Sequence, residues 1–575
     1  MRTRFVAEII AGPRARDPLN PDQPAARFDG AARAGSFVEV EMREGVAHPV
    51  REIAPRRSAL ASLVRIAVDH ALDPLFPAAV HEEVEALLRA GTDAPAGTED
   101  PSLADLTGVP FVTIDNADSR DLDQALHVER DGSGHRVRYA LADAAYYVRP
   151  GTALFEEALS RGSSFYLPGW MVPMLPRALS EGIVSLNEGV LRRALVFDMR
   201  LDAHGRCTKT EIVRARIRSH KKLSYDGVQA YYDKPDGHPI EGTAYAPSLD
   251  ALRIVGQRRI AEAVQRDVVH HRRRTVEVGL SGARSFVMYS GLRNDVERYN
   301  EQLSLLCNVE GAELLRGGRE ETQAIYRVHP SPPEERVQSF QKQVGAIVEI
   351  HELPDTWRWD RGEVSLASYL AELPHDSPVS AAIQRQAIMM NVRSTFSEEA
   401  AGHHGVGADV YARFSSPMRE IVGIFLHKEL VELIGGDTAS IEDDEATRAK
   451  VIEAANRSKN VQRRLTALGN LLALDQLFEV DRRMKQDARP VRHGTVMGLT
   501  NAKVYVSLDH PAIDVKLYKR DLQRSLETKL RLADDDLCLV SERGEVITRV
   551  GDRITLRVSH KESDRGHWVL SIVDA

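Results

Sequence analysis

The chain has 575 residues, of which 43% are hydrophobic, 28% charged and 6% aromatic. This length corresponds to about three or four compact domains, which excludes a single small module. Its only cysteines are Cys207, Cys307 and Cys538, which are odd in number and far apart. They form neither a disulfide framework nor a CxxC zinc motif, so we expect a protein of the reducing cytoplasm.

No apolar run approaches the roughly 20 residues that a membrane-spanning helix requires. The short apolar stretch at the start is interrupted by Glu8 and lacks a clean cleavage site, so we predict no signal peptide and no membrane partner. The net charge of -8 does not by itself suggest a nucleic-acid partner, because proteins that bind polyanions commonly carry an excess of Lys and Arg.

The first 95 residues predict a small mixed α/β domain. Residues 13–35 are rich in Pro, Gly and Ala, which is typical of an exposed loop, whereas residues 36–53 alternate apolar and polar side chains. Residues 58–90 have the apolar spacing of two helices with a turn at Asp73 and Pro74. The helix pair is either a winged helix-turn-helix or, as the commoner outcome, a plain packing hairpin.

A linker-like stretch at residues 91–101 separates this part from the rest of the chain. Residues 105–487 mix short β-like runs with long helical stretches, which predicts one large α/β domain or two fused ones. Residues 490–575 predict a small β-barrel of the OB type, because six short strands fit the alternation at 494–497, 503–507, 514–517, 537–541, 553–558 and 568–572.

The most informative stretch is TIDNADSRDLDQAL, residues 113–126, in which Asp115, Asp118, Asp121 and Asp123 fall within nine positions. Carboxylates so close repel one another unless a cation or solvent relieves them. If Asp121 and Asp123 lie on an extended segment, the period of two places both on one face, where Asp115 can converge on them. Hard oxygen ligands of this kind suit magnesium or manganese.

Two other interpretations of the acidic stretch compete with a catalytic metal site. A solvated acidic turn accounts for most Asp-rich loops. A calcium loop of the EF-hand type fails, because a frame that starts at Asp121 meets Ala125 and Leu126 where a polar ligand and Gly are required.

Four ordered motifs together resemble the RNase II (RNB) family of exoribonucleases. The first is the acidic stretch itself, and the others follow over some 300 residues. They are YLPGW (166–170) continued by PMLPR (173–177), IYRVH (325–329), and SSPMR (415–419), which is similar to the family's TSPIR. The terminal barrel is similar to the S1 domain that follows an RNB catalytic domain, so the resemblance assigns residues 105–487 to catalysis and 490–575 to RNA binding.

The resemblance implies hydrolytic, processive 3′ to 5′ degradation of single-stranded RNA to 5′-nucleoside monophosphates. It makes Asp115, Asp121 and Asp123 ligands of Mg²⁺ or Mn²⁺, with Asp123 the most critical, and it places Arg419 on the scissile phosphate. The family motif ends in Asp-Asp, whereas this chain has Gln124 in the last position. A Gln amide offers a neutral oxygen, so we expect Gln124 to hold one ion more weakly.

Other positions also depart from the family. After Arg419 the family continues with a second Arg, a Tyr and an Asp, whereas this chain has Glu420, Ile421 and Gly423. Tyr166 matches an aromatic that stacks on the 3′-terminal base in the family. The family resemblance leads us to expect a second aromatic residue where this chain has Gln323. We therefore expect a one-sided base clamp, in which an aromatic ring stacks on only one face of the RNA base.

Local basic runs, at residues 214–222 and 272–274, either follow RNA phosphates or form a solvated charged face. The family commonly carries cold-shock OB domains before its catalytic core, but residues 1–90 look too helical for two barrels. We expect a monomeric exoribonuclease. The rival is a nonenzymatic RNA-binding protein that keeps the fold, favoured by Gln124; an endonuclease or small-substrate phosphodiesterase is weaker, because an S1-like barrel would then have little purpose.

Overall fold

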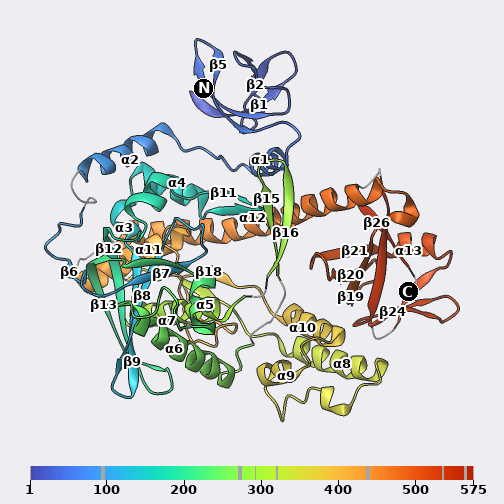
Figure 1. The fold of residues 1–575 in the computed structure, drawn as a ribbon. Helices are drawn as coiled ribbons and strands as arrows, with labels where there is room; N and C mark the ends of the chain where they lie inside the picture. The colour runs from blue at the N-terminus through green and yellow to red at the C-terminus, as the bar shows by residue number, and fades with distance from the viewer. Residues whose placement is uncertain are drawn as a thin grey trace.

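The computed structural model of the protein describes residues 2–91, 97–269, 275–291, 293–318, 322–435, 441–533, 536–562 and 566–573 (Figure 1). It contains an N-terminal β-barrel, a large central α/β domain and a C-terminal β-rich unit. The prediction of a multidomain α/β protein is confirmed. None of the helices described here is both long and apolar enough to cross a membrane.

Residues 4–54 form a closed barrel with the strand order β1-β2-β3-β5-β4. The prediction of an exposed loop at residues 13–35 is wrong, because this segment contains two strands of the barrel. Each has three residues and a single buried side chain, so the period of two could not be seen in the sequence. The strands are β1 (Arg4–Ile10), β2 (Arg14–Arg16), β3 (Ala26–Phe28), β4 (Phe37–Arg43) and β5 (Val46–Ala54).

The two predicted helices are present as α1 (Ala59–Asp69) and α2 (Ala78–Ala90), but they do not form a helix-turn-helix. α1 packs against the long helix α12 (Ile441–Arg482) and against β16 (Ser285–Gly291). α2 packs against α4 (Ala153–Arg161). α1 thus packs on both the barrel, through Val64 and Val68, and the central domain, whereas α2 packs on the central domain through Val80 and Val84.

The central domain is built on a seven-stranded sheet with the order β14-β7-β8-β9-β12-β13-β6. The pairs β14–β7 and β13–β6 are parallel, and the other neighbours are antiparallel. Buried apolar side chains of β8, β9 and β12 form the largest core of the molecule. The strands are β6 (Ala104–Asp105), β7 (Val112–Asp115), β8 (Gln124–Asp131), β9 (Gly134–Ala142), β12 (Leu191–Leu201), β13 (Cys207–Arg218) and β14 (Lys221–Ser224).

Helices pack around this sheet, small hairpins lie beside it, and α12 runs from it to the C-terminal unit (Figure 1). The helices are α3 (Ala144–Tyr147), η1 (Ala178–Ile183), α5 (Tyr225–Asp233), α6 (Ala246–Gln265), α7 (Asp295–Arg316) and α11 (Ile421–Gly435). The hairpins pair β10 (Phe165–Leu167) with β11 (Trp170–Val172), β15 (Thr275–Ser281) with β16, and β17 (Tyr326–Val328) with β18 (Thr395–Ser397).

A helical segment between β17 and β18 packs on the C-terminal unit. It contains α8 (Glu334–Ile350), η2 (Asp355–Trp357), α9 (Leu366–Glu372) and α10 (Pro378–Met390), and α10 contacts β19. All six predicted C-terminal strands are present, in the five-stranded sheet β21-β20-β19-β25-β26 and the sheet β22-β23-β24. This unit comprises η3 (Gln486–Ala488), β19 (Val491–Leu499), β20 (Lys503–Leu508), β21 (Asp514–Tyr518), α13 (Lys519–Ser525), β22 (Leu530–Leu532), β23 (Cys538–Ser541), β24 (Val546–Arg549), β25 (Arg553–Lys561) and β26 (Trp568–Ile572).

Candidate active site

The acidic cluster lies where β7 ends and β8 begins. Asp115 is the last residue of β7, and Gln124 is the first of β8. Asp121 and Asp123 lie in the loop between these strands. Asp118 is exposed on the same loop.

Two polar side chains from outside hold this loop. The Nζ of Lys222, on β14, donates to the carbonyl of Ala117 at 2.9 Å. The hydroxyl of Ser185 accepts from the N–H of Leu122 at 2.9 Å and donates to the carbonyl of Arg120 at 2.7 Å. The sequence pointed to Lys222 only as part of a basic run, and its role in fixing the acidic loop became visible in the fold.

Asp123 is the most buried of the predicted site carboxylates, with 3% of its surface exposed. Its Oδ1 accepts from the N–H of Met418 at 2.9 Å, and its Oδ2 accepts from the Nε of Arg419 at 2.8 Å. Burial raises the pKa of Asp123 to about 6, against the attraction of Arg419. The first and last motifs of the family resemblance are therefore joined directly through Asp123.

Asp121 and Asp115 extend the cluster toward solvent. Burial raises the pKa of Asp121, and the charge of Asp115 adds to this effect, while Arg419 opposes it. Asp115 accepts from the N–H of Asn116 at 2.7 Å and from the hydroxyl of Ser119 at 3.0 Å. A carboxylate has about four acceptor sites, so these contacts leave lone pairs for another partner.

The donor set of the three aspartates fits a divalent cation. All three offer carboxylate oxygens, and burial, which raises the pKa of Asp121 and Asp123 despite the attraction of Arg419, makes a bound cation a favourable partner for their charged forms. Mg²⁺ and Mn²⁺ prefer such oxygen ligands. No choice of one oxygen from each of the three side chains brings all three within 4.8 Å of one another. The aspartates are therefore farther apart than the ligands of a preformed structural metal site.

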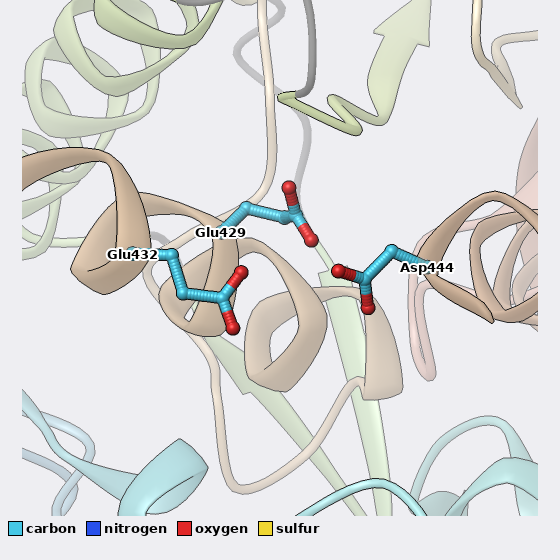
Figure 2. Close-up of side chains that lie close together, drawn as sticks. All are labelled: Glu429, Glu432 and Asp444. Carbon is cyan, nitrogen blue, oxygen red and sulfur yellow. The ribbon is translucent and has the colours of Figure 1, made fainter. Parts of the chain in front are cut away.

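A tighter group of acids lies elsewhere, in α11 and α12. Ligand atoms of Glu429, Glu432 and Asp444 lie within 4.8 Å of one another, the one such trio among the described residues (Figure 2). The Nζ of Lys428 already contacts one oxygen of each, at 3.1, 2.8 and 2.8 Å respectively. This cluster is an ion-pair network that joins two helices and is distinct from the predicted site.

Gln124 lies beside the aspartates, but its amide oxygen already has a donor. That oxygen accepts from the hydroxyl of the fully buried Tyr139. Burial raises the pKa of Tyr139 well above its ordinary value, so the phenol stays protonated and donates. Gln124 as a metal ligand remains a prediction, which depends on the second lone pair of the same oxygen.

The loop that carries Arg419 is fixed by a buried amide. The side-chain oxygen of Asn308, on α7, accepts from the N–H of Phe414 at 2.7 Å and of Ser415 at 3.1 Å. Its amide nitrogen donates to the hydroxyls of Tyr411 and Ser415, both at 3.0 Å. His427, on α11, donates from Nε2 to the carbonyl of Phe414 at 3.0 Å.

Gly423, where the family has Asp, has a steric role in this chain. A Cβ at this position would lie 2.8 Å from the Cα of Pro417, closer than side chains approach a backbone. The absence of a side chain therefore lets α11 pack directly beneath the loop that carries Arg419.

Tyr166 lies on β10, opposite Arg419. The segment before β10 pairs with the Arg419 loop, because the N–H of Ser164 donates to the carbonyl of Arg419 at 2.9 Å. The side chain of Tyr166 is 43% exposed, and its hydroxyl interacts with Arg419, while burial raises its pKa to about 12. On α12, Gln462 bonds both backbone groups of Tyr166 at 2.8 Å.

A second aromatic ring, which the sequence analysis missed, lines the same cavity as Tyr166. This cavity of about 250 Å³ is bordered by Phe396 of β18 as well as by Arg419. Gln323, where an aromatic was expected, is buried and donates its N–H to Glu429 at 2.7 Å, in the other acidic cluster. A second aromatic ring therefore lines this cavity, from a strand far from Tyr166 in the sequence, and the one-sided base clamp stays a prediction.

The first predicted basic run is largely neutralised within the fold. Arg216 pairs with Asp105 at 2.9 Å, and Lys221 pairs with Glu188 at 2.9 Å. These contacts favour a charged face over a phosphate track. The second run, residues 272–274, lies outside the described residues.

Comparison with known proteins agrees with this arrangement. Residues 103–436, more than half of the chain, match the model of the RNB domain. The chain belongs to the RNB family.

Its relatives include ribonucleases R. Ribonuclease R of Vibrio cholerae is 29% identical over 421 residues, which cover 72% of this chain and 50% of that protein. Ribonuclease R of Escherichia coli is 26% identical over 585 residues, which cover 95% of this chain and 67% of that protein. The chain thus spans between half and two thirds of the length of these relatives.

Solved structures share the fold. RNase R of Mycoplasma genitalium, in complex with ribose-methylated single-stranded RNA, superposes with a TM-score of 0.81 at 20% identity, covering 100% of this chain and 90% of that one. Yeast Ssd1, described as a pseudonuclease, gives a TM-score of 0.62 at 13% identity, covering 100% and 83%. The same fold therefore occurs in proteins with and without nuclease activity.

Proposed function

We propose that the protein is a hydrolytic, processive 3′ to 5′ exoribonuclease that degrades single-stranded RNA to 5′-nucleoside monophosphates. The observation that carries this proposal is the contact of Asp123 with both Met418 and Arg419, beside a cavity lined by Tyr166. Two motifs separated by almost 300 positions thus meet at one acidic, partly buried point. Family membership and the naming of relatives as ribonuclease R support the same activity.

The residues have separable roles in this proposal. Asp115, Asp121 and Asp123 would hold Mg²⁺ or Mn²⁺, with Gln124 as a weaker neighbour, and such an ion supplies Lewis-acid stabilisation of negative charge on a phosphate. Arg419 presents a fixed guanidinium fork toward the scissile phosphate and stabilises charge that develops in the transition state. Asp123 orients that fork through its Nε.

Tyr166 would stack on the 3′-terminal base, which holds the RNA end without reading its sequence. We propose that the N-terminal barrel and the C-terminal unit are of the OB type, the latter as an S1 domain. Barrels of this type bind single strands through aromatic stacking and basic grooves. We propose further that the chain works as a monomer in the cytoplasm, which size-exclusion chromatography with light scattering and fractionation would test.

The test is a time course with 5′-labelled single-stranded RNA, with magnesium, with EDTA and with Asp123→Asn. The expected result is conversion of the labelled RNA to a short labelled remnant with few intermediates, with 5′-mononucleotides among the unlabelled products separated by chromatography, and both abolished by EDTA and by the substitution. Labelled products of intermediate size that accumulate without mononucleotides would indicate an endonuclease and contradict the proposal.

A second candidate function rests on Gln124. Its contact with Tyr139 shows that one family carboxylate position has become part of a neutral hydrogen-bonded pair. An RNB-fold protein that binds RNA without cleaving it would have this feature. Intact RNA that nevertheless binds tightly in the time course would support this alternative.

A further inference from the structure

A second cavity, separate from the one beside Tyr166, lies between α6, α7 and the start of β13. Its volume is about 270 Å³, and it shares no lining residue with the cavity beside Tyr166. Small-molecule sites are commonly cavities of roughly 300 Å³ or more, with an apolar lining and a few polar groups. The volume is therefore at the lower end of that range, and the side chains of the cavity indicate what it can hold.

Arginines form the cationic part of this cavity. Arg206 is exposed, and its guanidinium makes no ion pair with any residue that the structure describes. Arg259, on α6, has 8% of its surface exposed, and its Nη1 lies 3.7 Å from Glu262 and donates to the carbonyl of Gly205 at 3.2 Å. Burial lowers the pKa of Arg259, so an anion beside it would stabilise its charged form.

The two glutamates of the cavity differ in their partners. The Oε1 of Glu262 lies 2.8 Å from the Nε of Arg266, which neutralises it. Glu310, on α7, accepts from the hydroxyl of Thr210 at 2.6 Å and has no cationic partner among the described residues. The cavity therefore combines a guanidinium and a carboxylate that each lack a countercharge.

The remaining lining is apolar except for one amide. Leu306 and Val309 of α7 and Val406 supply apolar surface. Gln302, also on α7, has 3% of its surface exposed. Its side-chain amide forms no hydrogen bond with any described residue and is not sealed from water, so it is open to the cavity that it lines. An amide offers both donors and an acceptor to a ligand.

Cys207 also lines the cavity, but it is not a nucleophile there. Burial raises the pKa of Cys207 to about 12, and the charge of Glu310 contributes. The thiol is therefore protonated at neutral pH, and a protonated thiol is a poor nucleophile. The groups of this cavity are suited to binding a ligand and not to attacking one.

We propose that this cavity binds a 5′-nucleoside monophosphate. The phosphate pairs with Arg206 and Arg259, the base packs on the apolar surface, and N–H groups of the base donate to Glu310 beside the amide of Gln302. This inference rests on the proposed function, which releases this class of molecule at the acidic site. A simple anion would use only the arginines, and an apolar molecule would use none of the charged groups.

Helix α7 connects the cavity with the loop that carries Arg419. Leu306 and Glu310 line the cavity, whereas Asn308, which holds that loop, projects from another side of the helix, because successive residues turn by about 100°. A nucleotide in the cavity therefore contacts the helix that positions Arg419 without contacting Arg419 itself. Binding there can be measured while the acidic site is occupied.

The test is isothermal titration calorimetry of the full chain with cytidine 5′-monophosphate. The chain carries Asp123→Asn, EDTA is present, and a twenty-nucleotide single-stranded RNA at saturating concentration occupies the proposed active site. We expect one nucleotide to bind per chain. Cytidine and inorganic phosphate, titrated separately, should each bind at least about tenfold more weakly, since each keeps only part of the contacts.

Two substitutions in the same background locate the binding. Arg206→Gln removes a charged partner of the phosphate and should weaken binding of the nucleotide at least about tenfold. Val309→Phe places a larger side chain in the cavity and should weaken it by a similar factor or abolish it. Arg253→Gln, at an exposed position of α6 outside the cavity, is the matched control and should bind as the parent chain does.

The outcomes separate this proposal from the proposed function. If the chain neither binds nor cleaves RNA, the proposed function fails, while the same titrations without RNA still test the cavity. Nucleotide binding that RNA displaces completely, or that both substitutions leave undiminished, would overturn the cavity as the site. Phosphate that binds as tightly as the nucleotide would also overturn the proposal, in favour of an anion site. Arg206→Gln, at an exposed position, keeps the test valid if Val309→Phe does not fold.

Discussion

At the residue scale, the site contains buried ionisable side chains whose burial costs stability, together with neighbouring groups that hold them in position. Asp123 is almost fully buried with a raised pKa, and Lys459, on α12, and Glu420 have buried atoms without partners. Perturbed ionisable groups gather where a ligand or charge is to be received. The neighbouring Gln124 breaks this pattern, because its oxygen is already bonded to Tyr139.

The substitution Gln124→Asp should lower the magnesium concentration required for half-maximal cleavage by about tenfold, because it adds one negative charge to the ligand set. A magnesium titration of cleavage rate measures this change. Asp118→Asn, on the exposed part of the same loop, is the control and should leave the titration unmoved. An unchanged half-saturation in Gln124→Asp would show that position 124 does not face the ion.

His427 makes the stability of the fold sensitive to acid. The ring is completely buried, and burial lowers its pKa from the ordinary 6.5 to about 4. The folded state therefore holds the neutral ring, and its contribution is complete above pH 6.5 and is lost as the pH falls toward 4. One pKa unit corresponds to about 1.4 kcal/mol, so His427 accounts for a loss of roughly 2–3 kcal/mol between these limits.

The measurement is urea unfolding at pH 7 and at pH 4.5. His427→Gln should show a difference in unfolding free energy between the two pH values that is smaller by about 2 kcal/mol than in the wild type. His204→Gln, at an exposed position, should retain the wild-type difference. An identical pH dependence in His427→Gln would contradict the assignment.

At the element scale, the site depends on one loop that three elements hold in place. Asn308 of α7 bonds its backbone at Phe414 and Ser415, α11 packs beneath it at Gly423, and the strand β10 follows the segment that pairs with it. The sequence showed these elements as separate motifs in order along the chain. These motifs come together only in the folded chain, where the central sheet and α12 bring them to one place.

The substitution Asn308→Ala should remove both acceptor bonds to the loop and leave two buried N–H groups unpaired. We expect the unfolding free energy to fall by about 2–3 kcal/mol and the cleavage rate to fall at least tenfold at saturating RNA, because Arg419 loses its fixed position. Thermal unfolding and single-turnover cleavage measure the two effects. Asn460→Ala, on the exposed face of α12, is the control. A fully active Asn308→Ala would show that the loop holds its shape without the amide.

The sequence predicted helices and strands correctly where the segment was long enough to show a periodic pattern of apolar residues. The six C-terminal strands and both N-terminal helices are present, as is the order of the family motifs. β2 and β3 were missed because three residues cannot display a period, and the partners of α1 and α2 were wrong because they lie far along the chain. Phe396 and Lys459 were missed for the same reason, since no local pattern links them to Tyr166.

At the scale of the whole molecule, the N-terminal barrel packs on α1, which in turn packs on the central domain. Val6, Phe37 and Ala54 of the barrel pack on Val64 and Val68 of that helix. α1 also contacts β11, the partner strand of β10, which carries Tyr166. The barrel is therefore connected, through α1 and β11, to the side of the cavity where Tyr166 lies. We expect a bound RNA strand to contact both the barrel and the cavity.

Removal of residues 2–54 should separate RNA capture from cleavage. Two linked binding sites raise the affinity for a ligand that spans them by 10²-fold or more, whereas a ligand that reaches only one gains nothing. We therefore expect a shortened chain that begins at Pro55 to cleave a five-nucleotide RNA at close to the full rate. Its rate on a twenty-nucleotide RNA at subsaturating concentration should fall by about tenfold to a hundredfold. Rates on both RNAs, with circular dichroism to verify that the rest of the chain stays folded, measure this. An equal loss on both lengths would mean that the barrel supports the catalytic domain and does not capture RNA.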